Sequence, residues 1–214
     1  AEGAFGVIVN GEILGCDGEA VIFSFDSPNI LSTSGGGCTA TNNELLARKV
    51  RNIRSSYGAG APEKVPVTAN GRFSEYQAAL GLWSLSRLEF HRARNKSIID
   101  VYKQSLNSID GIQFLGERED VISNYQDAVL GIQGPEPDVM RDRIRSVLEK
   151  QNILTTGKNR AYFDNTDVFS SWCDGRVFPN MRQLSNTSLF LPVGSKVTPA
   201  LAEKIGVLVE SCFH

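Results

Sequence analysis

Histidine is scarce in this sequence of 214 residues, and neither sign of charge is in marked excess. The two histidines are His91 and the terminal His214, and so few histidines disfavour both a Ser-His-Asp triad and a histidine-based metal site. We therefore expect no metal site. The formal net charge is −2 at pH 7, and without a basic excess the chain is a poor candidate for binding nucleic acid.

Cysteine is also sparse, and long apolar runs are missing. The cysteines lie far apart and form no CxxC pair, which disfavours a thiolate zinc site or a redox motif and is typical of reduced thiols. They are Cys16, Cys38, Cys173 and Cys212. No run approaches the roughly 20 apolar residues of a membrane helix, so we expect no membrane partner. The reduced thiols predict a cytoplasmic protein. Hydrophobic residues make up 41% of the chain, which is enough for a packed core.

The N-terminal residues lack the features that usually open a protein. Residues 1–6 contain no initiator methionine, no basic segment and no signal-like apolar stretch. We expect the chain to begin within a domain.

The region before residue 42 is typical of short strands joined by turns. Apolar runs at 5–9, 19–25 and 38–41 predict strands, and Asn10-Gly11 predicts a hairpin turn. The glycine-rich run at 34–37 fits neither the P-loop nor the dinucleotide-binding pattern, because no Gly-Lys-Ser/Thr follows it. By itself this run indicates a flexible turn.

A first helix is predicted to begin near Asn42, a good N-cap residue. Leu46, Val50 and Ile53 form one apolar stripe along it. The other face is basic, and we interpret it as a solvated face. Its members are Arg48, Lys49, Arg51 and Arg54.

A longer helix is predicted from Ser74, which forms an S-x-x-Q capping box with Gln77. The helical pattern extends to about Leu106, with a break near Asn95 as the alternative.

The remaining sequence alternates between strand and helix patterns. Strands are predicted at 112–115 and 128–132, a helix at 138–150, and an irregular stretch at 163–182. A last helix begins at Thr198-Pro199, an N-cap followed by proline in the first turn. Strands that alternate with helices predict an α/β protein.

The order of several motifs resembles the DegT-type (DegT/DnrJ/StrS) nucleotide-sugar aminotransferases, which are fold type I enzymes that use pyridoxal phosphate (PLP). Residues 21–37 resemble the strand and glycine loop around the family's cofactor lysine. Residues 70–82 are similar to the motif N-x-R-x-S-E-x-Q-A-A, and residues 160–163 to Arg-x-Tyr-Phe. Residues 191–194 resemble the family's C-terminal Leu-Pro segment.

This resemblance implies the C-terminal portion of a fold type I PLP-dependent transferase. The end of the large-domain sheet would come first, followed by a small α+β domain. Residues 1–70 would belong to the large PLP-binding domain, residues 71–106 would form bridging helices, and residues 107–214 would form the small domain.

The resemblance also assigns roles to individual residues. Ser24 would bind the cofactor phosphate, and Asn70 would reach the phosphate of a neighbouring subunit's cofactor, which implies a dimer. Arg160, Tyr162 and Asp164 would lie on the substrate side. From the residues alone, the capping of a turn is favoured for Ser24, the support of a loop for Asn70, and ordinary strand and loop packing for the other three. With the resemblance, the cofactor roles of Ser24 and Asn70 become as well supported as these structural ones.

Asn29 departs from the family pattern, because it stands where the family has the lysine that bonds covalently to PLP. An amide nitrogen is neither a nucleophile nor a base near neutral pH, since its lone pair is delocalised into the carbonyl. Gly3 stands where the family usually has a glutamine or histidine against the cofactor ring, and the carboxylate that partners the ring nitrogen would lie before Ala1.

Three interpretations of function follow, and they leave open whether the chain is an enzyme. The first is amino transfer from an amino acid, with glutamate expected, to a nucleotide-linked keto-sugar, impaired by Asn29. The second is a non-catalytic subunit, either in a homodimer or paired with a lysine-bearing paralogue. The third is a sugar dehydratase that uses pyridoxamine phosphate; it is less favoured, because Asn29 is no substitute for the base that this chemistry requires.

Overall fold

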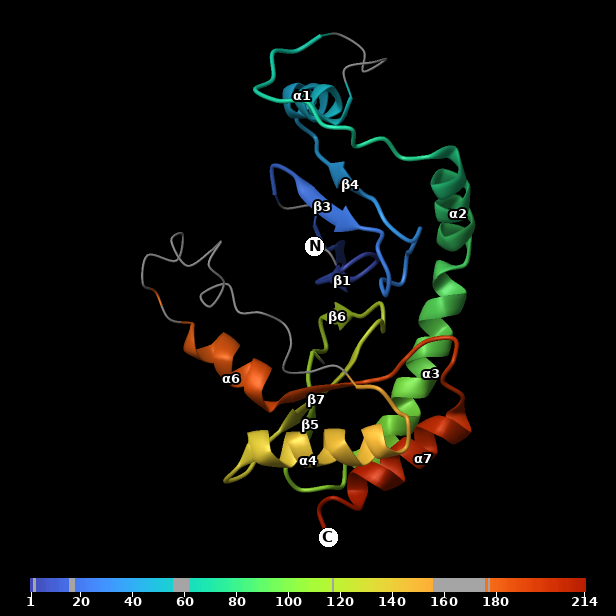
Figure 1. The fold of residues 1–214 in the computed structure, drawn as a ribbon, viewed down its shortest axis with the longest axis vertical. Coiled ribbons are helices and arrows are strands. Elements are labelled where there is room, and N and C mark those ends of the chain that lie inside the picture. The colour runs from blue at the N-terminus through green and yellow to red at the C-terminus, as the bar shows by residue number, and fades with distance from the viewer. Residues whose placement is uncertain (2, 16–17, 56–61, 117, 156–175, 177) are drawn as a thin grey trace. The chain divides into compact units, whose positions relative to one another are not determined.

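The computed structural model describes residues 1, 3–15, 18–55, 62–116, 118–155, 176 and 178–214 (Figure 1). The chain forms two compact units. Unit 1 comprises Ala1–Ala93 and Arg118–Gln126, and unit 2 comprises Arg94–Glu117 and Asp127–His214. Among the helices of these described segments, none has both the length and the apolar character that a membrane crossing requires.

Unit 1 begins with a small antiparallel sheet of order β2-β1-β6. Strand β1 (Ile8–Val9) and strand β2 (Glu12–Ile13) form a hairpin. Asn10 and Gly11 both have positive φ, 52° and 82°, as a type I′ hairpin turn requires, so the predicted turn is confirmed. The third strand, β6 (Val121–Ile122), was not predicted, because its pairing with β1 joins residues far apart in the sequence.

The second sheet of unit 1 pairs β3 (Val21–Ser24) with β4 (Gly37–Ala40) in antiparallel register. Ser24 lies opposite Gly37, so the segment 25–36 returns the chain from one strand to the other. Both strands match the predicted apolar runs, although β4 begins one residue before the prediction.

Helix α1 (Glu44–Arg54) follows β4, and its N-cap is Asn43 rather than the predicted Asn42. The side-chain oxygen of Asn43 accepts a hydrogen bond from the Leu46 amide at 3.1 Å. The amide of Asn43 in turn donates to Thr41 Oγ1 at 3.1 Å. The helix therefore begins one residue later than predicted, because the side chain of Asn43 supplies the acceptor for an amide of the first turn.

The long helical pattern divides into α2 (Glu75–Ser86) and α3 (Leu88–Leu106). The capping box is confirmed, since Ser74 Oγ accepts from the Gln77 amide and Gln77 Oε1 accepts from the Ser74 amide. The alternative break near Asn95 is wrong: Asn95 is buried inside α3, and the break lies at Arg87. There the Arg87 amide bonds to the Ser84 carbonyl, three residues back, which tightens the last turn and ends α2.

Unit 2 contains an antiparallel sheet of order β5-β7-β8, formed by β5 (Ile112–Phe114), β7 (Ala128–Ile132) and β8 (Ser188–Leu191). Its other helices are α4 (Pro137–Lys150), α6 (Pro179–Thr187) and α7 (Pro199–Glu210). The predicted strands and helices at 112–115, 128–132 and 138–150 are confirmed within about one residue, and so is the start of α7 after Thr198. Most of the irregular stretch predicted at 163–182 lies outside the described residues. The prediction is wrong at 179–182, where proline at the first turn opens α6.

The core of unit 2 contains large apolar side chains that have no exposed surface. Eight of them are 0% exposed: Tyr102, Leu106, Leu130, Ile144, Leu148, Leu189, Ile205 and Val209. The Tyr102 hydroxyl donates to the Pro192 carbonyl at 2.8 Å. Helices α3 and α7 approach so closely that a Cβ on Gly206 would lie 2.6 Å from Ser105 Cβ.

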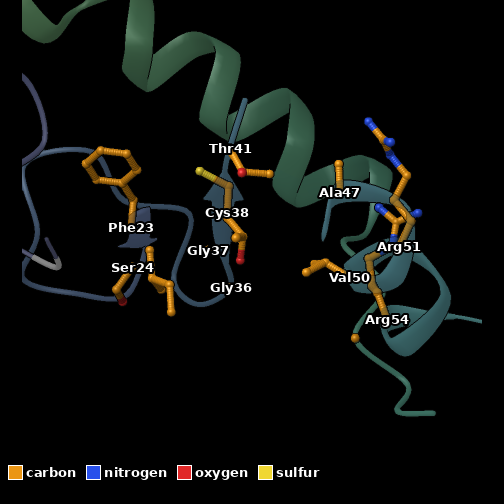
Figure 2. Close-up of a pocket in the computed structure, with 13 residues that line it drawn as sticks. Phe23, Ser24, Gly36, Gly37, Cys38, Thr41, Ala47, Val50, Arg51 and Arg54 are labelled. Carbon is orange, nitrogen blue, oxygen red and sulfur yellow. The ribbon is translucent and has the colours of Figure 1, made fainter. Parts of the chain in front are cut away.

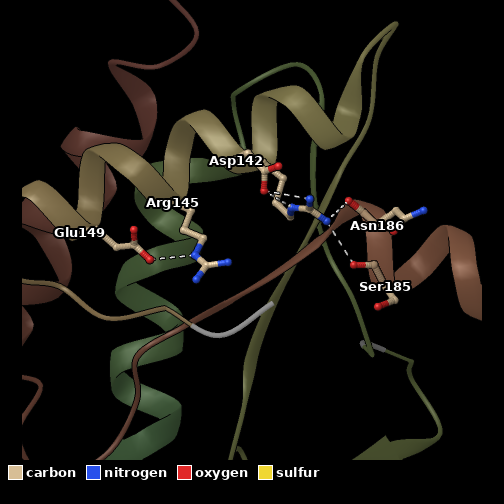
Figure 3. Close-up of polar contacts among 6 residues, drawn as sticks. Asp142, Arg145, Glu149, Ser185 and Asn186 are labelled. Atoms are coloured by element: carbon tan, nitrogen blue, oxygen red, sulfur yellow. Dashed lines mark hydrogen bonds and ion pairs between the residues drawn. The ribbon is translucent and has the colours of Figure 1, made fainter. Parts of the chain in front are cut away.

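A buried arginine joins α4 to the end of α6. The side chain of Arg141 is 1% exposed and pairs with Asp142, with Nη2 at 2.8 Å from Oδ1. Its Nη1 donates to the carbonyls of Ser185, at 3.2 Å, and Asn186 (Figure 3). Arg141 thus satisfies carbonyl groups that a helix leaves without partners at its C-terminus.

Candidate functional site

The segment between β3 and β4 folds around one backbone carbonyl. Phe25 O accepts hydrogen bonds from the amide of Thr33 at 2.8 Å, the amide of Gly35 at 3.3 Å and the hydroxyl of Ser32 at 3.3 Å. The Phe25 amide donates to Gly36 O at 2.9 Å. Thr33 is only 2% exposed. The loop is therefore ordered by its own backbone, which differs from the flexible turn that the glycine run alone indicates.

Two of the loop's glycines occupy positions that a larger residue would not fit. A Cβ on Gly36 would lie 2.5 Å from the Phe73 ring, and Gly36 has a φ of +88°. A Cβ on Gly37 would lie 2.4 Å from the Phe23 carbonyl oxygen. The glycines allow the segment before α2 to pack on the loop, where the rings of Phe25 and Phe73 meet edge to face with centroids 6.3 Å apart.

Ser24 ends β3 and lines a cavity of about 490 Å³ (Figure 2). Its hydroxyl oxygen accepts a long hydrogen bond, 3.3 Å, from the Asp26 amide. Accepting this bond leaves the hydroxyl proton able to donate to a ligand oxygen. Ser24 therefore both caps the turn and offers a donor to the cavity.

Helix α1 contributes two cations to the same cavity. Arg51 and Arg54 line it across from Ser24, as Figure 2 shows. Their neighbour Arg48 instead binds Glu63, with Nε at 2.8 Å from Oε1, and also lies 3.7 Å from Glu44. Positive charge and a hydroxyl around one cavity favour an anionic ligand.

Asn29 has its side-chain amide engaged at both ends. Its Nδ2 donates to the backbone carbonyl of Ser24 at 3.1 Å. Its Oδ1 accepts from Gln126 Nε2 at 3.1 Å. The Asn29 backbone amide donates to Asp26 O at 3.0 Å. The residue at the expected lysine position is thus built into the turn that follows β3.

Asn70 lies on a fixed segment with its side chain exposed. The neighbouring amides of Ala69 and Gly71 donate to the carbonyls of Ile53 and Arg54, at 2.6 and 3.0 Å, at the end of α1. Gly71 lines the same cavity as Ser24. Two expected site segments therefore border one cavity, while Arg160, Tyr162 and Asp164 lie outside the described residues.

Sequence reasoning missed Asn124 and Gln126, which lie beside the site. The side chain of Gln126 bonds to Asn29 and to the Ile30 amide, and Asn124 is 4% exposed. The signal available was weak: a short polar run immediately before the predicted strand at 128–132.

The residues present fit one end of PLP and not the other. The Ser24 hydroxyl suits its phosphate, but no lysine is found among the described residues that line the cavity. Partial burial raises the pKa of Cys38, so this cavity residue stays a neutral thiol near pH 7 and does not replace a lysine amine. Within the described segments, no group of three or more His, Cys, Asp or Glu side chains is placed to hold a metal ion.

Comparison with known proteins assigns this chain to a family of aminotransferases. The model of the DegT/DnrJ/EryC1/StrS aminotransferase family matches residues 1–210. The putative pyridoxal phosphate-dependent aminotransferase EpsN of Bacillus subtilis is 26% identical, over 99% of this chain and 54% of its own length. The dTDP-4-amino-4,6-dideoxy-D-glucose transaminase of Shigella dysenteriae is 25% identical, over 88% of this chain and 51% of its own. The chain thus spans about half the length of these relatives.

Solved structures show the same fold. DesI, crystallised with its TDP-sugar product, has a TM-score of 0.88 at 24% identity, over 99% of this chain and 54% of DesI. PseC of Helicobacter pylori, an aminotransferase of pseudoaminic acid biosynthesis, has a TM-score of 0.87 at 18% identity, over 100% of this chain and 58% of PseC. At these identities the likeness concerns the fold, and the coverage matches the C-terminal portion expected from the sequence.

Proposed function

Because the chain belongs to the DegT/DnrJ/EryC1/StrS aminotransferase family, whose cofactor is PLP, we propose that it serves in amino transfer to a nucleotide-linked keto-sugar. The amino donor is an amino acid, with glutamate as the expected donor. Asn29 impairs this chain in the covalent step, so the chain binds the reaction's components without itself bonding to the cofactor.

The observation that carries this proposal is the amide at position 29. Both ends of the Asn29 amide are hydrogen-bonded within the protein, and neither atom is a nucleophile. The names of relatives support the reaction class: one is a dTDP-sugar transaminase, and another is the GDP-perosamine synthase of Caulobacter vibrioides, 34% identical over 48% of this chain and 28% of its own length.

In this proposal the chain's residues bind and orient. The Ser24 hydroxyl donates to the cofactor phosphate, and Arg160, Tyr162 and Asp164 contact the substrate. PLP supplies the carbonyl chemistry that moves an amino group, which no protein side chain offers. Residues 1–70 belong to the large domain, 71–106 to the bridging helices and 107–214 to the small domain of a cytoplasmic protein.

A non-catalytic partner subunit is the second candidate, and the placement of Asn70 favours it. Its backbone is tied to the end of α1, while its side chain is exposed and free to reach a neighbouring subunit. In a homodimer or in a pair with a lysine-bearing paralogue, Asn70 donates to the phosphate of the neighbour's cofactor. The dehydratase interpretation has less support, because neither Asn29 nor the adjacent Gln126 is a base.

Borohydride reduction tests the proposal. The purified protein is mixed with PLP, reduced, and analysed by mass spectrometry of its peptides. We expect reversible binding that Ser24→Ala weakens, and no reduced adduct specific to one lysine. A single stoichiometric lysine adduct would contradict the proposed loss of the covalent step.

Co-purification with a lysine-bearing family member separates the two candidates. A stable mixed assembly whose activity falls with Asn70→Ala in this chain supports the partner subunit. Amino transfer by this protein alone contradicts it.

A further inference from the structure

Two side-chain amides, those of Asn29 and Gln126, connect the loop at position 29 to the rest of unit 1. Gln126 Oε1 accepts from the Ile30 amide at 2.7 Å, and Gln126 Nε2 donates to Asn29 Oδ1 at 3.1 Å. Asn29 Nδ2 then donates to the Ser24 carbonyl at 3.1 Å. The chain of bonds thus begins at one backbone group and ends at another.

The two backbone ends fix the orientation of both amides. The Ile30 N–H is a donor, so the oxygen of Gln126 must face it, and the NH₂ group of Gln126 must face position 29. The Ser24 carbonyl is an acceptor, so the NH₂ group of Asn29 must face it. Position 29 therefore needs an acceptor toward Gln126 and a donor toward Ser24, and an asparagine supplies both.

Gln126 is itself held firmly. Its backbone amide donates to Asn124 Oδ1 at 3.0 Å. Asn124 Nδ2 donates to the carbonyls of Gly3, at 2.9 Å, and Phe5, at 3.1 Å. Since Asn124 is buried, Gln126 is anchored to a part of the molecule that does not depend on the loop.

Gly3 lies beside the same glutamine. A Cβ on Gly3 would touch Gln126 Nε2 at 3.4 Å, so a longer side chain at position 3 would compete with Gln126 for space. The two departures from the family pattern, Gly3 and Asn29, therefore meet at Gln126.

We infer that Asn29 and Gln126 form an amide clamp, which consists of their mutual hydrogen bond and their bonds to the backbone of Ser24 and Ile30. The clamp fixes the loop at the family's lysine position as a structural turn. A lysine restored at position 29 is incompatible with the clamp. A lysine ammonium has only donors, so it would face the NH₂ group of Gln126 with no acceptor between them. Rotating the Gln126 amide would set its NH₂ group against the Ile30 N–H instead. This inference rests on the proposed function only in identifying position 29 with the lysine of the family.

A double-mutant cycle on the whole chain tests the clamp. Asn29→Ala, Gln126→Ala and the double variant are unfolded in urea, and Ile30 amide exchange is followed by NMR. We expect each single change to lower the folding equilibrium constant about tenfold, as for the loss of a partly buried hydrogen bond, and the double change to cost much less than the product. Ile30 protection falls in Gln126→Ala. Additive effects, or unchanged Ile30 exchange, would overturn the inference.

Charge-restoring variants give a second readout. Asn29→Lys destabilises unit 1, whereas Asn29→Lys with Gln126→Glu recovers it, because a carboxylate accepts from both the ammonium and the Ile30 amide. Asn42→Lys, at an exposed position, is the matched control and leaves stability unchanged. Asn29→Lys as stable as the parent, with PLP trapped on Lys by borohydride, would refute the clamp. If Asn29→Lys fails to fold, Asn29→Asp replaces it, since it keeps the acceptor toward Gln126 and loses the donor to Ser24.

These results are independent of the proposed function. A lysine adduct in the parent chain would refute the proposed loss of the covalent step, and it would not affect the coupling between positions 29 and 126. Absence of coupling between positions 29 and 126 would refute the clamp, and it would not affect the proposal that the parent chain forms no lysine adduct.

Discussion

Nearly all of the buried apolar core of the described residues lies in unit 2, whereas unit 1 leaves many of its apolar side chains in contact with solvent. Leu130 and Leu189 in unit 2 are 0% exposed, but Ile22 and Leu82 in unit 1 are 67% and 71% exposed. Helix α2 shows the contrast most clearly, because it exposes large apolar side chains over about half of its circumference. They are Tyr76, Leu82, Trp83 and Leu85. An exposed apolar helix face of this kind is typical of one that other polypeptide covers.

The comparison teaches that the two units are stabilised by different means. Unit 2 is held by burial of apolar area around its sheet. Unit 1 relies more on backbone ties, such as the three donors that meet at Phe25 O and the amide clamp. Stability in unit 2 should therefore respond to side-chain volume, and stability in unit 1 to hydrogen-bonding groups.

The largest expected effect is that of Leu148→Ala in unit 2. It removes a side chain with no exposed surface from the core, and we expect a loss of about 2–5 kcal/mol in the free energy of unfolding. Leu82→Ala is the matched control and should cost within about 0.5 kcal/mol, because Leu82 is 71% exposed. Hydrogen exchange of each unit, read by mass spectrometry, measures both. Equal costs would remove the distinction between the units.

Arg141→Met tests whether a polar group also contributes to the core of unit 2. It leaves the carbonyls of Ser185 and Asn186 without their donor, and we expect a cost of about 1–3 kcal/mol in unit 2. Arg145→Met, which removes the exposed pair with Glu149 in Figure 3, should cost only about 0.3–0.5 kcal/mol. Urea unfolding of the two variants gives the comparison, and a larger loss for Arg145→Met would contradict it.

Tyr102→Phe is expected to cost about 1–2 kcal/mol, because the buried Pro192 carbonyl loses its donor. Burial also raises the pKa of the Tyr102 phenol above its ordinary value near 10. Since folding favours the protonated phenol, its contribution is full below about pH 10 and is lost as the pH rises further. Alkaline unfolding should therefore be less steep in Tyr102→Phe than in the parent chain. Identical alkaline profiles would show that Tyr102 does not titrate on unfolding.

The smallest effect belongs to unit 1. Ser74→Ala removes the hydroxyl of the capping box, and we expect a loss of about 0.5–1 kcal/mol in local stability of α2. Ser86→Ala at the other end of α2 is the control, since its hydroxyl only donates to the Trp83 carbonyl. Amide exchange in the first turn of α2 reports the difference. No change there would mean that the cap does not limit the opening of α2.

Features set by neighbouring residues were predictable from the sequence. The Asn10-Gly11 turn, the Ser74 capping box and the Thr198 cap each follow from the dihedral angles or hydrogen bonds of a few consecutive residues. Strand β7 was predicted at its observed limits, because a continuous apolar run marks a strand buried on both faces.

Features set by distant residues were not predictable. Strand β6 has only two residues and exists because Val121 pairs with Val9. The site shows the same limit: Asn29 was identified as a departure, but its partner Gln126 lies 97 positions away and no local pattern points to it. A single sequence carries no signal for such a contact.

The close approach of α3 and α7 constrains how this protein can evolve. A methyl group on Gly206 would overlap Ser105, whose own hydroxyl is bonded to the Val101 carbonyl. Alanine at position 206 is therefore expected to destabilise the protein while serine stands at position 105, and glycine at position 105 relieves the overlap at a cost of about 1 kcal/mol inside a helix. Natural variants that carry alanine at position 206 should therefore carry glycine at position 105.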